Sequence, residues 1–185
     1  MEQIKELTKR LIANSFKELM LQIPFEKITI KMITDHASVI RPTFYNHFHD
    51  KYELVEWIVN DEIIDPAREM FELGNIPDGL KHLFEGFCND REYYRRTFDI
   101  VGQNGFGETL IDCLSRMFEE ILGMYPVPPG EPDCVPLLAR YYAGGLMTVI
   151  RYLVFDAPDM TTEEIMKQYH YMIEHSLYQL IKKDN

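Results

Sequence analysis

The stretch of sequence that decides the fold is residues 29–54, which read TIKMITDHASVIRPTFYNHFHDKYEL. Its apolar residues recur at helical spacing in two short groups, which Ser38 and Val39 separate. Thr29 stands where its hydroxyl can cap the first group as a helix. Pro42 falls in the first turn of the second group, where its missing N–H costs nothing. The sequence therefore predicts two short helices joined by a tight turn.

A pair of short helices in this order is the smallest motif that places one helix in the major groove of DNA while the other supports it. In the first helix, Ile30, Ile33 and Ala37 have the spacing of one inward face. In the second, Phe44 and Phe48 lie four residues apart and are expected to anchor the helix to the core. The side chains left outside, most of them polar or hydrogen-bonding groups that suit base edges and phosphates, are Arg41, Pro42, Thr43, Asn46 and His47, with Tyr45 beside them.

The same stretch resembles the TetR family of bacterial transcription regulators. That family has a Thr before the first short helix, an Ala and usually a Gly at the turn, a T-x-Y-x-H/Y-F run in the second helix, and a Lys and a Leu soon after. The corresponding residues here are Thr29, Ala37, the run 43–48, Lys51 and Leu54. Ser38 stands where Gly is usual, so the resemblance does not fix the backbone angle of the turn.

The resemblance implies a role for each matching position. The phosphate contacts that it implies are Thr29, Tyr45, Lys51 and His47, and the base-facing positions are Arg41, Pro42, Thr43 and Asn46. Lys51 also lies at the start of a predicted helix, whose N-terminal amides favour an anion. The implied partners are double-stranded DNA with a palindromic operator, a second copy of the chain, and a small-molecule inducer. Members of the family are usually repressors, so we expect a repressor.

The distribution of charge agrees with a DNA-binding N-terminus. The chain has a formal net charge of −11, which on its own disfavours nucleic acid. Residues 1–54 carry eight Lys/Arg against seven Asp/Glu, whereas the other 131 residues carry 11 against 23. Only the N-terminal part is therefore expected to approach phosphate.

The rest of the chain has helical spacing nearly throughout, which predicts an all-α protein of about nine helices. A long helix after Asp50 is apolar on several sides, and Pro66 is expected to end or kink it. Thr161 and Glu164 form a capping box at the start of the last helix. We divide the chain into a helix-turn-helix DNA-binding domain, residues 1–48, and a helical regulatory and dimerisation domain, residues 49–185.

The second domain is rich in aromatic residues, a composition that suits either a plain helical core or an apolar ligand pocket. Its runs at 93–96 and 101–106 and its helix around 142–146 resemble the Firmicute regulators related to the dihydroxyacetone-kinase operon activator. The residues expected to line a pocket are Phe84, Phe87, Tyr94, Phe98, Phe106, Met117 and Tyr141. The alternative is a helical regulator or adaptor that is switched by a partner protein and takes no small molecule.

The family resemblance also implies that the last two helices pair with those of a second copy in a four-helix interface. Gly144 and Gly145 would permit a close approach of helices there. The residues that we expect in this dimer interface are Leu146, Ile173, Leu177 and Leu180.

Other function classes find little support in the sequence. There is no P-loop, GxSxG, HExxH or dinucleotide fingerprint, so we expect neither an enzyme nor a cofactor. His47 and His49 point apart at their i, i+2 spacing, which argues against a metal site. The three cysteines are far apart and predict no disulfide framework. Neither a signal peptide nor a membrane-spanning run is recognisable, so we expect a cytoplasmic protein.

Overall fold

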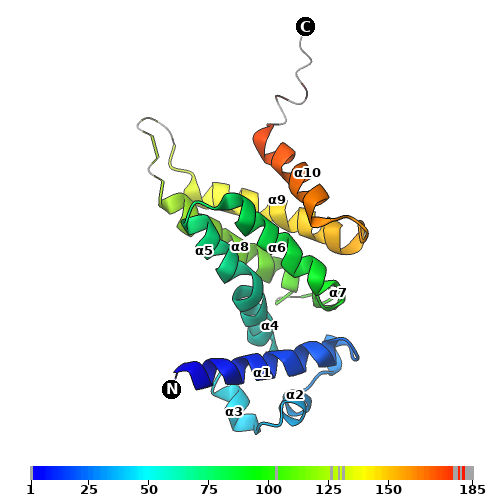
Figure 1. Cartoon of the computed structure of the whole chain (residues 1–185). Helices are drawn as coiled ribbons and strands as arrows, with labels where there is room; N and C mark the ends of the chain where they lie inside the picture. The colour runs from blue at the N-terminus through cyan, green and yellow to red at the C-terminus, as the bar shows by residue number, and fades with distance from the viewer. Residues whose placement is uncertain are drawn as a thin grey trace.

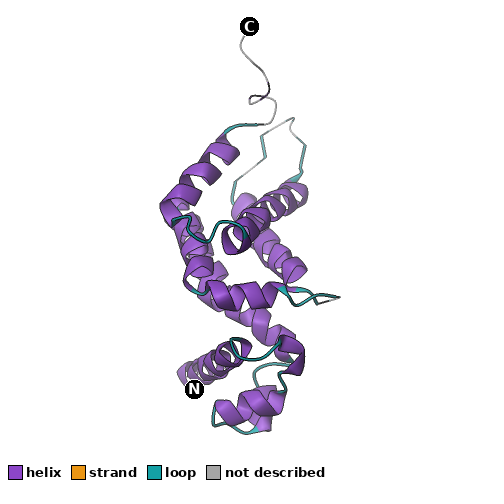
Figure 2. Ribbon diagram, turned by 90° about the vertical axis from the view of Figure 1, so that its right-hand side faces the viewer, coloured by secondary structure: helices purple, strands orange, loops and turns teal. Residues whose placement is uncertain are grey.

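A computed structural model describes residues 2–102, 104–125, 127–128, 130, 132–176, 179 and 181 of the chain. Every regular element in these residues is a helix (Figures 1 and 2). A small unit at one end is built from three helices, α1 (Glu2–Met20), α2 (Ile30–His36) and α3 (Arg41–Tyr45). From it α4 (Lys51–Val59) leads into a larger helical body. The all-α fold expected from the sequence is confirmed.

The N-terminal unit is held together by the apolar face of α1. Ile12, Phe16 and Met20 on that face are fully buried, and the Phe16 ring meets the edge of Phe25 at 6.2 Å between centroids. Ile33 of α2 is buried in the same core. Burial of a large apolar side chain contributes about 1.5–3 kcal/mol, so this core fixes the short helices, which have little stability alone.

The turn between α2 and α3 has the hydrogen bonds of a Schellman motif. The Val39 N–H donates to the Thr34 carbonyl at 2.9 Å, and the Ser38 N–H donates to the Asp35 carbonyl at 3.3 Å. Ser38 itself takes a φ of 54°, in the left-handed region that glycine adopts most easily. At the other end of α2, the Thr29 side chain accepts from the Met32 N–H at 3.3 Å, which confirms the predicted cap.

The long helix does not end at Pro66. It continues from α4 through a π turn, Asn60–Ile64, into α5 (Asp65–Glu72), and Figure 1 shows the rod changing direction there. Proline lacks the N–H that would bond to the carbonyl four residues earlier, which belongs to Glu62. The Asp65 N–H instead reaches back to the Asn60 carbonyl. With α4, the π turn and α5 counted as one helix, the described residues contain nine helices besides a short 3-10 helix, Phe25–Lys27.

The body is organised around two long antiparallel helices, which short helices cover (Figure 1). Its helices are α6 (Ile76–Asn89), α7 (Arg91–Phe98), α8 (Phe106–Gly123), α9 (Val135–Phe155) and α10 (Thr162–Glu174). Leu110 and Leu114 of α8 and Ala143 and Ile150 of α9 are buried in the core that these two helices share.

The last helix begins at the predicted capping box. The Glu164 N–H donates to the Thr161 hydroxyl at 3.2 Å, and the Thr161 N–H donates to the Glu164 carboxylate at 2.9 Å. The backbone hydrogen bond from Thr161 lowers the pKa of the Glu164 carboxyl. Within the described residues, no helix combines the length and the apolar character needed to cross a membrane.

The left-handed conformation of Ser38 should cost stability that a glycine would recover. We expect Ser38→Gly to raise the free energy of unfolding by about 1 kcal/mol, because the Cβ of an L-residue is strained at positive φ. For a chain of this size that gain corresponds to a rise in Tm of about 2–4 °C, which calorimetry would measure. Ser38→Ala is the control, since it removes the hydroxyl but keeps the Cβ. An equal gain from both variants would contradict the account of the turn.

Candidate nucleic-acid interface

The short helix α3 is fixed by two buried aromatic side chains. Phe44 and Phe48 are buried, with ring centroids 5.7 Å apart, and Phe48 meets Trp57 of α4 at 5.6 Å. Backbone hydrogen bonds from the Asn46 and Phe48 N–H groups continue the helical path past the end of α3. This anchor determines which side of α3 faces the solvent.

The remaining side chains of α3 and its last turn form one outward face. Arg41, Pro42, Tyr45 and Asn46 are exposed, and Thr43 and His47 are half-buried. All six predicted contact residues of this segment are therefore accessible together on one side of the unit. Figure 1 places α3 at the end of the molecule away from the body.

Thr29 and His47 are two more of the predicted phosphate contacts: Thr29 precedes α2, and His47 belongs to the outward face. Thr29 is exposed, and its hydroxyl accepts the capping bond while its own O–H remains available as a donor. Burial and the positive charges of Lys9 and Lys5 lower the pKa of the His47 imidazole. At neutral pH this imidazole is therefore uncharged and offers a hydrogen bond rather than a cation.

Lys51 lies at the first turn of α4, and its amine points toward the protein. The ammonium donates to the carbonyls of Phe25 at 2.7 Å and Ile28 at 3.1 Å, and it lies 4.1 Å from the centre of the Phe25 ring. Burial lowers the pKa of this amine. Two of its three donors thus brace the segment before α2, a role that sequence reasoning missed because both acceptors are backbone atoms more than 20 residues away.

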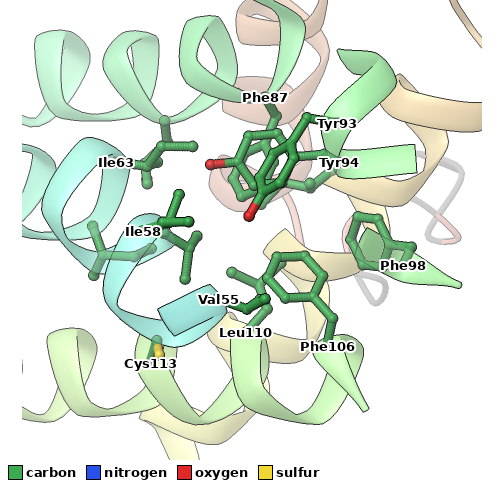
Figure 3. Close-up of a cluster of buried hydrophobic side chains, with 14 of the residues drawn as sticks. Val55, Ile58, Ile63, Phe87, Tyr93, Tyr94, Phe98, Phe106, Leu110 and Cys113 are labelled. Carbon is green, nitrogen blue, oxygen red and sulfur yellow. The ribbon is translucent and has the colours of Figure 1, made fainter. Parts of the chain in front are cut away.

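Six of the seven predicted pocket residues are buried in the body: Phe84, Phe87, Tyr94, Phe98, Phe106 and Met117. Phe87, Tyr94, Phe98 and Phe106 form one aromatic cluster, whereas the Phe84 ring meets Tyr169 of α10 at 5.6 Å. Ring centroids lie 4.6 Å apart between Phe87 and Tyr94 and 4.9 Å apart between Phe98 and Phe106 (Figure 3). Tyr141 departs from the expectation, because it is 72% exposed on the outer side of α9.

The same cluster contains two polar atoms that sequence reasoning did not anticipate. The hydroxyls of Tyr93 and Tyr94 are buried and have no hydrogen-bond partner among the described residues. Burial raises the pKa of both phenols well above the ordinary tyrosine value. Figure 3 shows them among the apolar side chains of Ile58, Ile63 and Phe87. An unpaired buried hydroxyl costs about 1–3 kcal/mol of stability. The two tyrosine hydroxyls are therefore hydrogen-bond donors without an acceptor in the described part of this core.

The residues predicted for the dimer interface divide into three cases. Leu146 is 0% exposed, so it belongs to the core of the protomer; this corrects its expected place on a free face. Ile173 is exposed near the end of α10. Leu177 and Leu180 lie outside the described residues. The large apolar side chains that α9 does expose are Leu137, Tyr141, Tyr142 and Tyr152.

Two family models match the chain. One, described as bacterial regulatory proteins, tetR family, matches residues 17–58. The other, described as a transcriptional regulator C-terminal region, matches residues 74–175, more than half of the chain. The chain belongs to the TetR family of bacterial transcriptional regulators. The family indicated by residues 29–54 is thereby confirmed.

One curated relative of this TetR-family regulator is the HTH-type dhaKLM operon transcriptional activator DhaS of Lactococcus lactis subsp. lactis (strain IL1403). The two are 27% identical over 94 residues, which are 51% of this chain and 50% of that protein. The chain thus spans about half the length of the curated relative that it matches. This match agrees with the resemblance to regulators related to the dihydroxyacetone-kinase operon activator.

Solved structures of other regulators share the fold. The dihydroxyacetone kinase operon activator DhaS has a TM-score of 0.61 at 20% identity, with 90% of this chain and 92% of that chain covered. FadR of Thermus thermophilus, a TetR-family repressor in complex with lauroyl-CoA, has a TM-score of 0.57 at 16% identity, with 95% and 97% covered. NalD of Pseudomonas aeruginosa, a repressor of a multidrug efflux pump, has a TM-score of 0.53 at 17% identity, with 90% and 96% covered.

The outward face of α3 predicts that Asn46 distinguishes base sequences. An amide side chain can pair with adenine through two hydrogen bonds, so Asn46→Ala should weaken binding to the operator by about 1–3 kcal/mol. Binding to random duplex should change little. Fluorescence anisotropy with an operator selected from random duplexes would measure both affinities. Asn14→Ala, the same change on an exposed site of α1, is the control. An equal loss on all sequences would make Asn46 a backbone contact instead.

Proposed function

We propose that this TetR-family regulator binds a palindromic DNA operator as a homodimer through α3, and that a small molecule in the body alters this binding. The observation that carries the proposal is the outward face of α3, held by the burial of Phe44 and Phe48. A helix so anchored presents its polar side chains as a rigid set, which direct readout in the major groove requires.

The roles of the individual residues follow from their chemistry and exposure. Arg41, Thr43 and Asn46 can donate to or accept from base edges, and Pro42 adds apolar contact. Thr29, Tyr45 and His47 can donate to phosphate oxygens, which fixes the register without reading sequence. Lys51 has one ammonium donor left beyond its two bonds to backbone carbonyls, and we assign that donor to phosphate.

A second copy of the chain is required because one α3 contacts only a few base pairs. Two recognition helices about 34–36 Å apart enter successive major grooves, and two-fold symmetry then doubles the site. The surface that suits this pairing is formed by α9 and α10. A groove of about 380 Å³ runs between them and is lined by Tyr141, Gly145 and Ile173 among others. A Cβ built on Gly144 or Gly145 meets no atom within 4 Å, so this side of α9 is free for another helix.

The dimer should dissociate when charges are placed on this surface. Tyr141→Glu with Ile173→Glu would bury four unpaired carboxylates around the two-fold axis, a cost that a dimer of this kind cannot offset. Sedimentation velocity should then show a folded monomer. Leu73→Glu with Val101→Glu changes two other exposed apolar residues by the same charge and should leave the dimer intact. A dimer that persists in the first variant at micromolar concentration would contradict this placement.

The aromatic cluster supports a small-molecule switch in the body. Its rings provide the apolar lining that such sites have, and the Tyr93 and Tyr94 hydroxyls provide unpaired polar groups at the centre. A ligand with an apolar body and one acceptor would satisfy a hydroxyl that now has no partner. To change operator affinity, such a ligand must bind more tightly to a dimer with one spacing between its DNA-binding domains than to a dimer with another spacing.

The close contact of the same rings supports one alternative, in which a partner protein switches the regulator. A ligand could enter this cluster only if the rings moved apart, whereas a partner could act on the exposed faces of the body. The two alternatives differ in a thermal-shift screen of small metabolites. A ligand at 100 times its Kd adds about 2.7 kcal/mol to the free energy of unfolding, whereas a body without a ligand site shows no change in melting temperature with any metabolite.

Tyr94→Phe provides a direct test of the small-molecule proposal. It removes one unpaired buried hydroxyl and keeps the ring, so the free protein should gain about 1–3 kcal/mol of stability. A ligand found with the wild-type protein should bind this variant more weakly, because its acceptor loses the donor. Denaturant unfolding with and without the ligand measures both effects. A loss of stability in the free protein would mean that the hydroxyl already has a partner.

A further inference from the structure

Glu62 connects two parts of the protein through its backbone and its side chain. It lies in the π turn, where Pro66 leaves its carbonyl without the usual helical donor. The ring of His82 on α6 lies with Nε2 3.1 Å from that carbonyl and takes the place of the missing donor. The side chain of Glu62 points the other way, to α1. His82 therefore connects α6 to this turn.

Lys17 of α1 is held between this turn and the far end of α6. Its ammonium donates to the Glu62 carboxylate at 2.7 Å and to the Asp90 carboxylate at 2.5 Å. It also lies 5.3 Å from the centre of the Tyr93 ring. Burial lowers the pKa of this amine, but the hydrogen bonds to Asp90 and Glu62 outweigh burial and raise the pKa above its ordinary value. The amine therefore stays charged at any physiological pH.

Another polar contact joins α1 to the body: the Arg96 guanidinium on α7 donates to the Met20 carbonyl at 3.2 Å. A cleft of about 420 Å³, lined by Lys17 and Tyr93 among others, lies between α1 and the junction of α6 with α7. Arg10 faces Asp61 at 3.4 Å, but its side chain is 60% exposed, and exposed pairs contribute little. The Lys17 side chain is only 16% exposed, so its two ion pairs are screened less.

We propose that Lys17 is a positioning residue, which Glu62 and Asp90 hold so that the DNA-binding unit keeps one orientation on the body. The inference rests on the proposed function, because orientation matters only if two copies of α3 must meet two grooves at a fixed spacing. A further consequence is that α6 is connected to α1 at two places. One connection runs from His82 through Glu62 to Lys17, and the other runs from Asp90 to Lys17. A ligand that moves α6 then reorients α3 without touching it.

The first measurement follows orientation in the full-length protein and needs no DNA. Spin labels at Asp35→Cys in the DNA-binding unit and Lys81→Cys on α6, with Cys88 and Cys134 replaced by serine, report the distance between the two parts by pulsed EPR. Labelled chains are diluted with unlabelled ones so that distances within one chain dominate. We expect Lys17→Met, which keeps the unbranched stem, to broaden the distance distribution.

Arg10→Met is the matched control, because it removes the same charge from the same helix but breaks only the more exposed ion pair, between Arg10 and Asp61. It should leave the distribution as in the wild type. Lys17→Glu should broaden it further, and Lys17→Glu with Glu62→Lys and Asp90→Lys should narrow it again, since a reversed pair on each side restores both attractions. A distribution in Lys17→Met that matches the wild type, or a reversed pair that fails to narrow it, would overturn the proposal.

The second measurement links orientation to DNA. With an operator obtained by selection, one base pair added between the half-sites should weaken wild-type binding roughly tenfold or more, because the two copies of α3 no longer match the grooves. In Lys17→Met the same insertion should cost less than about threefold. Equal losses would overturn the positioning role. If the protein selects no operator, the proposed function fails, and the EPR result alone decides whether Lys17 sets the orientation.

Discussion

The burial of Phe44 and Phe48 is the constraint on which the remaining structure depends. Two rings four residues apart fix the rotation of a helix of only one to two turns, and each contributes about 1.5–3 kcal/mol when buried. Their position decides that Arg41, Asn46 and Tyr45 face outward together. The core beneath them is built by α1, whose Lys17 forms ion pairs with Glu62 and Asp90 of the body. Recognition chemistry and the orientation of the DNA-binding unit are therefore linked through one small core.

The features of the fold that could be predicted from sequence are those whose signal is local. Thr29 and Thr161 were predicted as caps because a cap is formed by residues three positions apart. The left-handed turn at Ser38 could not be derived, since serine carries no preference for positive φ and only the surrounding core enforces it. A bend at Pro66 was one of the two outcomes expected, but the π turn that forms it and the contact of His82 with Glu62, 20 residues away along the chain, could not be derived.

The candidate site shows the same division. The outward residues of α3 followed from the spacing of Phe44 and Phe48, because helical periodicity fixes both faces at once. The inward bonds of the Lys51 amine and the burial of Leu146 did not follow, because each depends on a neighbour distant in sequence. Lys17 had no distinguishing pattern, since a lysine on an amphipathic helix is ordinarily a solvated group. Its role emerges only when α1, the π turn and the end of α6 are brought together.

The central claim, that α3 reads an operator, is tested most directly by titrating the wild-type protein against its best selected palindrome and a random duplex of equal length from 50 to 200 mM salt. We predict that at physiological salt the palindrome binds at least about 10³ times more tightly than the random duplex. Both affinities should fall with salt along log–log lines whose slopes count the neutralised phosphates. Equal affinity for the two duplexes at every salt concentration, or no binding to either, would contradict the account.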